Sequence, residues 1–325
     1  MGKRLRANSF LGLVVGLAAL WFLASCSRVE ESKGTAGAQR VTTFQGRPPI
    51  RVVTTTGMIA DLVANIGGPH VAVEALMGEG TDPHLYKASP GDVKKLSGAD
   101  LIFYNGLHLE GKMVDIFERL ARSQPTFAVS AGIPEENLRS PPEFQGQHDP
   151  HIWFDVSLWA RAAVYVRDVL IRFDPPRAES YRTQGEQYLA RLKELHDEVA
   201  RELASIPEER RILITAHDAF GYFGRAYGIR VLGIQGISTD SEAGVRRMRE
   251  LVELILAKKV KSVFVESSVS ERSIQALVEG CKAQGRGVTI GGQLFSDAMG
   301  KAGTPEGTYL GMVRHNVKTI VQALR

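Results

Sequence analysis

Three of the eight histidines lie in short segments that combine turn-forming and aromatic residues. Two of them each close an Asp-Pro-His triplet, and the third directly follows a β-branched apolar run. A fourth segment, Phe-Ser-Asp-Ala-Met-Gly, supplies a carboxylate in a similar setting. Imidazole is the commonest metal-binding side chain, and three imidazoles with one carboxylate can complete the shell of a divalent transition metal. We therefore predict one metal site made by His84, His151, His217 and Asp297.

The two Asp-Pro-His triplets can be explained structurally as well as functionally. Proline fixes its own backbone and biases the preceding aspartate toward an extended conformation, so each triplet holds its imidazole on a stiff approach. For a single triplet, a surface turn is the simpler explanation. Two copies, each beside aromatic residues such as Tyr86 and Trp153, favour metal ligands.

The other candidate groups have alternative explanations. His148 competes with His151 but lies in a polar stretch, where an exposed loop histidine is expected. His217 could be a buried structural histidine, and Asp297 could cap a helix. Glu266 ends a predicted strand and could orient a ligand histidine through its ring N–H, or accept hydrogen bonds at a helix terminus. The histidines interpreted as structural are His70, His108, His196 and His315.

The first 26 residues resemble an export signal. Three basic residues precede an apolar run at 10–23, which has the length of a signal-peptide core and is short for a membrane span. The run ends in Leu-Ala-Ser-Cys, which resembles the bacterial lipobox and predicts cleavage before Cys26 and lipidation of its thiol. The alternative is an ordinary signal peptide with an incidental cysteine. Residues 26–49 read as a lipidated cysteine and a flexible polar tether.

The net charge gives no indication of nucleic-acid binding, and the cysteine content leaves no pair for an intrachain disulfide if Cys26 is lipidated. Removal of residues 1–25 takes away three basic residues and lowers the formal charge from +4 to +1, so nothing indicates nucleic-acid binding. If Cys26 carries lipid, Cys281 has no partner for an intrachain disulfide. Cys281 falls on an apolar helical pattern and is interpreted as a small buried hydrophobic residue.

From Ile50 onward, short apolar runs alternate with amphipathic segments, which is typical of α/β architecture. The predicted strands are 51–55, 71–76, 101–104, 126–129, 211–215, 230–234, 262–266 and 287–290. The predicted helices are 58–66, one opening at Ser89, 109–121, 177–206, 220–227, 245–257, 273–283 and 310–324. We expect two open α/β lobes, each with a four-stranded, mostly parallel sheet flanked by helices.

One proline-free segment is long enough to join the two lobes. Apolar residues at helical spacing run from Tyr181 to Leu203, and a 30-residue helix would span roughly 45 Å. The predicted organisation is a signal peptide at 1–25, the tether at 26–49, a first lobe at 50–174, a linking helix at 175–206 and a second lobe at 207–325. Open α/β sheets bind ligands beyond the carboxyl ends of their strands, where His84, His217 and Asp297 are expected.

Five stretches together resemble the metal-binding receptors of ABC importers, the cluster A-I or TroA-like family. They are Asp-Pro-His at 82–84, Asp-Pro-His-Ile-Trp at 149–153, Thr-Ala-His-Asp-Ala-Phe-Gly-Tyr-Phe at 215–223, Phe-Val-Glu-Ser-Ser at 264–268 and Ser-Asp-Ala-Met-Gly at 296–300. The resemblance implies two lobes bridged by a long rigid helix. It also implies ligands at His84, His151, His217 and Asp297, and an extracytoplasmic solute-binding protein that delivers zinc or manganese to an ABC permease.

Two departures from the family pattern affect the choice of metal. The long His-rich acidic loop of many zinc-specific members is absent, whereas His217 stands where many manganese-specific members have Glu. Three nitrogens and one carboxylate suit tetrahedral zinc, and manganese prefers more oxygen. The ligand set therefore favours Zn²⁺ over Mn²⁺, with either metal as the transported ligand and no organic cofactor expected.

The resemblance also implies partners and a location. We expect the permease and its ATPase as partners, a bacterial membrane reached through the lipid on Cys26, and a monomer that is not an enzyme. Two alternatives are a secreted zinc-dependent hydrolase, with Glu266 as the only obvious base, and a metal-stabilised surface adhesin. Because the ligands must be neutral imidazoles, metal affinity should fall below about pH 6.5.

Overall fold

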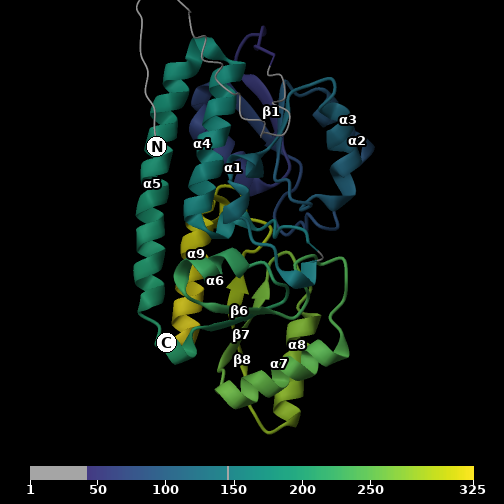
Figure 1. Ribbon diagram of the computed structural model, residues 1–325, viewed down its shortest axis with the longest axis vertical. Coiled ribbons are helices and arrows are strands. Elements are labelled where there is room, and N and C mark those ends of the chain that lie inside the picture. The colour runs from purple at the N-terminus through teal and green to yellow at the C-terminus, as the bar shows by residue number, and fades with distance from the viewer. Residues whose placement is uncertain (1–41, 145) are drawn as a thin grey trace, which may run out of the picture. The chain divides into compact units, whose positions relative to one another are not determined.

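A computed structural model describes residues 42–144 and 146–325 (Figure 1). The predicted signal peptide, Cys26 and the tether up to residue 41 lie outside the described residues. The first lobe is built on a four-stranded parallel sheet in the order β2-β1-β3-β4. Its strands are β1 Ile50–Thr54, β2 Val71–Ala75, β3 Leu101–Tyr104 and β4 Thr126–Ala128.

The first lobe has four α-helices among the described residues, and two of them begin at a residue whose side chain caps the helix. They are α1 Gly57–Gly67, α2 Pro90–Ser97, α3 Val114–Leu120 and α4 Val156–Phe173. At the start of α2, the Ser89 hydroxyl accepts the Asp92 N–H and the Asp92 carboxylate accepts the Ser89 N–H. This reciprocal capping box confirms the helix start predicted at Ser89. The helix predicted at 109–121 is shorter, because a 3₁₀ turn at Gly111–Met113 precedes α3.

Helix α4 was not predicted from the sequence. The Asp155 carboxylate caps it by accepting the N–H groups of Ser157 and Leu158, at 3.0 and 3.4 Å. Its buried face includes Trp159 and Val166 at helical spacing. Helix α4 packs against α5, and its position beside the linking helix makes it part of the main core.

The linking helix α5 covers Ala178–Ala204, within the predicted range. Its 27 residues correspond to about 40 Å at the rise of an α-helix. One face is buried over its whole length, from Tyr181 through Tyr188 to Leu203. This face contacts α1 and α4 of the first lobe and α6 and α9 of the second, as can be followed in Figure 1.

The second lobe has the same alternation of strands and helices. Its strands are β5 Ile212–Thr215, β6 Arg230–Gly233, β7 Ser262–Glu266 and β8 Thr289–Leu294. Its helices are α6 Gly221–Tyr227, α7 Val245–Lys258, α8 Arg272–Ala283 and α9 Tyr309–Leu324. The strands form two parallel pairs, β5–β6 and β7–β8, with β5 beside β7. The α/β class is confirmed, and the continuous four-stranded ladder is found in the first lobe.

The largest hydrophobic core is shared by the two lobes. Its buried residues run from Ile50 in β1 to Leu324 in α9, and they include the inner faces of α1, α4, α5 and α9. Two smaller cores lie within single lobes, one between β5, β7, α7 and α8, and one around Ile102 and Phe117. The continuous core holds the helices of both lobes against α5. In the described part of the chain, no helix combines the length and apolar character needed to cross a bilayer.

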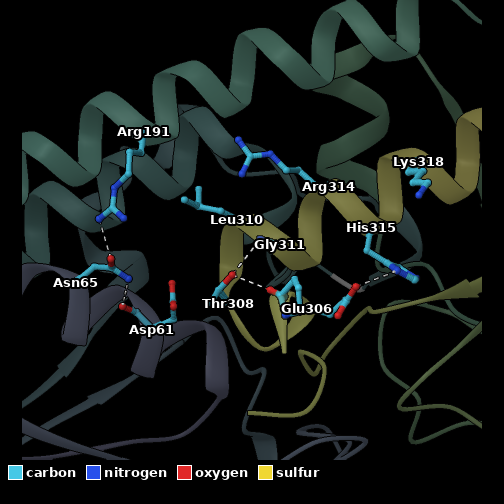
Figure 2. A pocket seen from close by; sticks show the side chains of 11 residues that line it. Asp61, Asn65, Arg191, Glu306, Thr308, Leu310, Gly311, Arg314, His315 and Lys318 are labelled. Atoms are coloured by element: carbon cyan, nitrogen blue, oxygen red, sulfur yellow. Dashed lines mark hydrogen bonds and ion pairs between the residues drawn. The ribbon is translucent and has the colours of Figure 1, made fainter. Parts of the chain in front are cut away.

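A surface pocket of about 580 Å³ lies where α1, α5 and α9 meet (Figure 2). Two of its guanidinium groups are already paired. Arg191 donates to Asn65 at 2.7 Å, and Arg314 forms a 2.8 Å ion pair with Glu198. None of the four predicted metal ligands lines this pocket, so it is separate from the predicted site.

Candidate metal site

The four predicted ligands converge on one buried point between the lobes. One ligand atom from each of His84, His151, His217 and Asp297 lies within 4.8 Å of all the others. His151 Nε2 is 3.3 Å from His84 Nε2 and 3.4 Å from His217 Nε2. The carboxylate oxygens of Asp297 lie 3.2 Å from His217 Nε2, 3.4 Å from His151 Nε2 and 3.8 Å from His84 Nε2.

These separations match the size of a tetrahedral zinc shell. Ligand atoms about 2.0–2.1 Å from a tetrahedral Zn²⁺ lie about 3.3 Å from one another. Two Nε2–Nε2 separations and two separations between an Nε2 atom and an Asp297 oxygen are 3.2–3.4 Å. The side chains are therefore arranged to hold a metal ion without a large rearrangement.

The second-lobe ligands follow directly from the ends of parallel strands. His217 lies two residues beyond β5, and Asp297 lies three residues beyond β8. Glu266 is the last residue of β7. Because β5 and β7 lie side by side and the His217 backbone N–H reaches the Glu266 carboxylate, the ends of these strands bring the two groups to one edge, as expected for an open α/β fold.

Each of the two predicted ligands from the first lobe ends its own Asp-Pro-His turn, and the two turns have the same hydrogen bond. The Asp82 carboxylate accepts the His84 backbone N–H at 2.9 Å, and the Asp149 carboxylate accepts the His151 backbone N–H at 3.0 Å. An aspartate that accepts the N–H two residues later forms an Asx-turn. The aspartate and the proline thus both fix the backbone at the histidine.

Asp149 also binds the His151 ring. Its Oδ1 lies 2.8 Å from His151 Nδ1, and its Oδ2 accepts a 2.5 Å hydrogen bond from Arg139. A carboxylate on Nδ1 keeps the proton there and leaves the Nε2 lone pair directed at the site centre.

Glu266 has the same relation to His217. One carboxylate oxygen accepts the His217 backbone N–H at 2.9 Å, and the other lies 2.6 Å from His217 Nδ1. Glu266 and His217 are both almost completely buried. The predicted orienting role of Glu266 is consistent with this contact and stays a prediction.

The Asp297 carboxylate is the group that most clearly requires a cation. It is buried, and neither of its oxygens accepts a hydrogen bond from any described residue. A buried carboxylate without donors is costly unless a charge compensates it. Burial raises the pKa of Asp297, but His217 and His151 outweigh burial and hold this pKa well below its usual range. The carboxylate is therefore ionised and faces the three imidazoles.

The imidazoles differ in the protonation that their surroundings favour. Burial lowers the pKa of His84 to about 3, against the opposing effect of Asp297. Burial also lowers the pKa of His151, but Asp149 and Asp297 outweigh it and raise this pKa to about 9. For His217, Glu266 and Asp297 outweigh burial and raise the pKa well above its ordinary value. The carboxylates around His151 and His217 thus favour the protonated form of these two rings when no ion is bound.

Hydrogen bonds between the lobes frame the site. The Trp153 indole donates to the Ser296 carbonyl at 3.0 Å, next to the Asp297 ligand. The Tyr309 hydroxyl donates to the Trp153 carbonyl at 2.7 Å, and the Tyr222 hydroxyl donates to the Asp149 carbonyl at 2.9 Å. The ligand loops of one lobe are thus anchored on the other.

The remaining histidines lie away from the cluster. His148 Nδ1 is 2.8 Å from the Ser140 hydroxyl, and His196 Nδ1 is 3.1 Å from the Tyr227 hydroxyl. His315 Nε2 is 3.1 Å from the Gln293 carbonyl. Neither His70 nor His108 belongs to the group of convergent ligands. Cys281 is buried, as predicted.

Several contributing residues were not singled out from the sequence. Asp149, Asp82 and Tyr222 were noted only as parts of their motifs, and Arg139 and Thr239 were not identified. The triplet itself carries a signal for the two aspartates, because Asx-turns recur at Asp-x-x sequences. The partners from the opposite lobe are separated from the ligands by up to 157 positions along the chain and have no local signal.

Comparisons with known proteins find relatives that match most of the chain. The model of a family described as ZnuA, zinc-uptake complex component A, periplasmic, matches residues 52–323. The manganese-binding lipoprotein MntA of Bacillus subtilis is 51% identical over 277 residues, which are 85% of this chain and 90% of the relative. The manganese ABC transporter substrate-binding lipoprotein PsaA of Streptococcus anginosus is 33% identical over 281 residues, 85% of this chain and 89% of the relative.

A solved structure has the same fold. The periplasmic zinc binding protein TroA from Treponema pallidum superposes with a TM-score of 0.83 at 49% sequence identity. The match covers 86% of this chain and 99% of TroA.

Proposed function

Because the chain belongs to the ZnuA family of zinc-uptake components, we propose that it captures Zn²⁺ or Mn²⁺ between its lobes and delivers the ion to an ABC permease. One observation supports the capture step above all others. Three Nε2 atoms and a donor-free carboxylate converge on a buried point with the spacing of a metal shell. The ion is the cargo of this protein.

We propose that His84, His151, His217 and Asp297 bind the ion directly. Asp149 and Glu266 support this assignment, because each binds the ring nitrogen that faces away from the centre. Each lobe contributes two ligands, so a bound ion ties the lobes together.

Zinc is the proposed tighter ligand. Nitrogen-rich shells and the order of intrinsic affinities both favour Zn²⁺ over Mn²⁺. The names of the two relatives at about 50% identity point to different metals, manganese for MntA and zinc for TroA. The metal taken up in the cell therefore depends on availability as well as affinity.

We propose that the protein works on the outer side of a bacterial cytoplasmic membrane, anchored by lipid on Cys26. The permease and its ATPase are its partners, consistent with the names of the lipoprotein relatives. A monomer suffices, because one chain supplies all four ligands. No catalytic role is proposed, since four protein groups close the shell and Glu266 binds His217 instead of facing an open metal position.

Metal titration of the stripped protein tests the function. We expect one Zn²⁺ per chain by isothermal titration calorimetry, with Mn²⁺ binding more weakly at the same site. His84→Ala and His151→Ala should lose most of the affinity for both ions, because each removes a ligand. His148→Ala is the matched control, since this histidine lies near His151 in sequence but outside the cluster. Parent-like zinc binding by both ligand variants, or none by the parent, would overturn the proposal.

A further inference from the structure

One loop of the second lobe reaches across to the first lobe beside the site. It comprises residues 234–244, between β6 and α7, and is called the crossing segment here. The Thr239 hydroxyl donates to Asp82 Oδ2 at 2.6 Å. The Lys112 ammonium group lies 3.1 Å from the Asp240 carboxylate. Both contacts join residues of different lobes.

The Thr239 hydrogen bond acts on the His84 loop through a shared carboxylate. The other oxygen of Asp82 accepts the His84 backbone N–H at 2.9 Å. One oxygen of Asp82 thus accepts a hydrogen bond from Thr239 of the second lobe, and the other accepts the backbone N–H of His84. Loss of the Thr239 hydroxyl would free one oxygen of Asp82 and loosen the turn that presents His84.

His84 is the ligand most dependent on such indirect support. His151 and His217 each have a carboxylate at Nδ1, whereas among the described residues no hydrogen bond or ion pair is found at His84 Nδ1. His84 is also 4% exposed, while His151 and His217 are 0% exposed, and the next residue, Leu85, is 46% exposed. The His84 loop is therefore the side of the shell nearest to solvent.

We propose that Thr239 is a positioning residue for metal retention, which restrains the His84 loop through Asp82 and so slows release of the ion. This inference rests on the proposed function. The hydrogen bond to Asp82 dominates, because it is short and partly buried and its acceptor is a carboxylate. The Lys112–Asp240 pair contributes less, since both side chains are more than a third exposed.

Zinc dissociation from the full-length protein tests the proposal. The protein is loaded with one Zn²⁺ and mixed with excess chromogenic chelator in a stopped-flow instrument. Thr239→Val should raise the dissociation rate by about tenfold, because it removes a hydrogen bond to a charged group at nearly constant shape. Thr239→Ser, which keeps the hydroxyl, should release zinc like the parent. Lys112→Ala should change the rate by about twofold at most.

A second measurement does not depend on the metal. In metal-free protein, backbone amides of the crossing segment should exchange hydrogen for deuterium faster in Thr239→Val than in the parent. Thr126→Val is the matched control, because its hydroxyl donates to the Gln124 carbonyl within the first lobe. Thr239→Ala provides a second variant without the hydroxyl, in case the valine protein fails to fold.

The outcomes separate this inference from the proposed function. A parent that binds no zinc would refute the function. One bound zinc in every variant, with the same release rate in Thr239→Val or Thr239→Ala as in the parent, would refute the role of Thr239 alone. Faster release from Thr239→Ser and Thr239→Val alike would also refute it, since the hydroxyl would then not be the cause.

Discussion

At the residue scale, two carboxylates outside the predicted ligand set contact the histidines of the cluster. Asp149 binds the outward ring nitrogen of His151, and Glu266 lies against that of His217. Each also accepts the backbone N–H of the same histidine, so one side chain fixes both the ring and the main chain. This double contact sets the tautomer and removes rotational freedom before an ion arrives.

Replacement of either carboxylate should weaken zinc binding without removing a ligand. Asp149→Asn and Glu266→Gln keep the size of the side chain but lose the charge that orients the imidazole. We expect each to lower zinc affinity by about 10–100-fold, measured by competition with a chelator of known affinity. Glu198→Gln, which changes a surface partner of Arg314, is the control. Unchanged affinity in both buried variants would contradict the orienting role.

Metal binding should release protons at pH values where free histidine is already neutral. The pKa of His151 is raised to about 9 and that of His217 is also raised, so protons compete with the ion for these rings near pH 7.5. An ion needs neutral rings, so affinity should keep rising from pH 7 toward 9. This window is higher than the value near 6.5 expected for ordinary imidazoles.

Calorimetry in two buffers of different ionisation enthalpy measures this release. At pH 7.5 the zinc-binding heat should depend on the buffer, and the dependence should be smaller in Asp149→Asn, where His151 loses its neighbouring charge. A buffer-independent heat in the parent would show that the rings are neutral before binding.

At the element scale, the sequence predicted what local chemistry determines. The capping box at Ser89 and the left-handed Gly228 after α6 mark their helix ends, and both elements lie where predicted. Helix α4 was not predicted, although Asp155 caps it and its buried residues fall at helical spacing. The split of the second-lobe strands into two pairs depends on packing between distant segments, and no periodicity encodes it.

For the site as well, residues in local motifs could be predicted from the sequence, and a partner that lies close only in the folded chain could not. His84, His151, His217 and Asp297 carry local motifs and could be identified as candidates, and the structure brings them together. Thr239 reaches the site from the opposite lobe through the fold alone. A hydroxyl in an ordinary loop has no signal in the sequence until its partner is known.

Gly185 in the linking helix makes a close approach between helices possible. It is buried on the face of α5 that meets α4, and an added Cβ would lie 2.7 Å from Arg167 Cδ. Alanine would improve helix propensity by about 1 kcal/mol but must displace Arg167. A leucine cannot fit, so Gly185→Leu should lower the free energy of unfolding by about 1–3 kcal/mol.

Urea denaturation followed by circular dichroism checks this effect. Gly111→Leu is the control, because an added side chain meets open space there. Equal stability of the two variants would show that α4 and α5 can move apart without cost.

At the scale of the whole molecule, the lobes share one core and one site. The main core extends from β1 to α9, and the ligands come in equal numbers from the two lobes. A bound ion should therefore stabilise the described part of the chain as one cooperative unit. At a free zinc concentration of 100 times Kd, the gain is about 2.7 kcal/mol.

Differential scanning calorimetry should show a single transition that zinc moves upward by several degrees, about 2–4 °C for each kcal/mol in a protein of this size. His217→Ala, which lacks one ligand, should show little zinc-dependent shift. Two transitions of which zinc moves only one would indicate lobes that unfold independently.

The four residues of the cluster and the helix that completes the core are not synthesised at the same time. Asp297 and α9 are encoded near the end of the chain, yet α9 packs against α1 and α5. A nascent polypeptide therefore carries all three imidazoles before it has the carboxylate or the helix that completes the core. Synthesis from the N-terminus therefore delays assembly of the four-residue cluster until the segment that carries Asp297 and α9 has emerged.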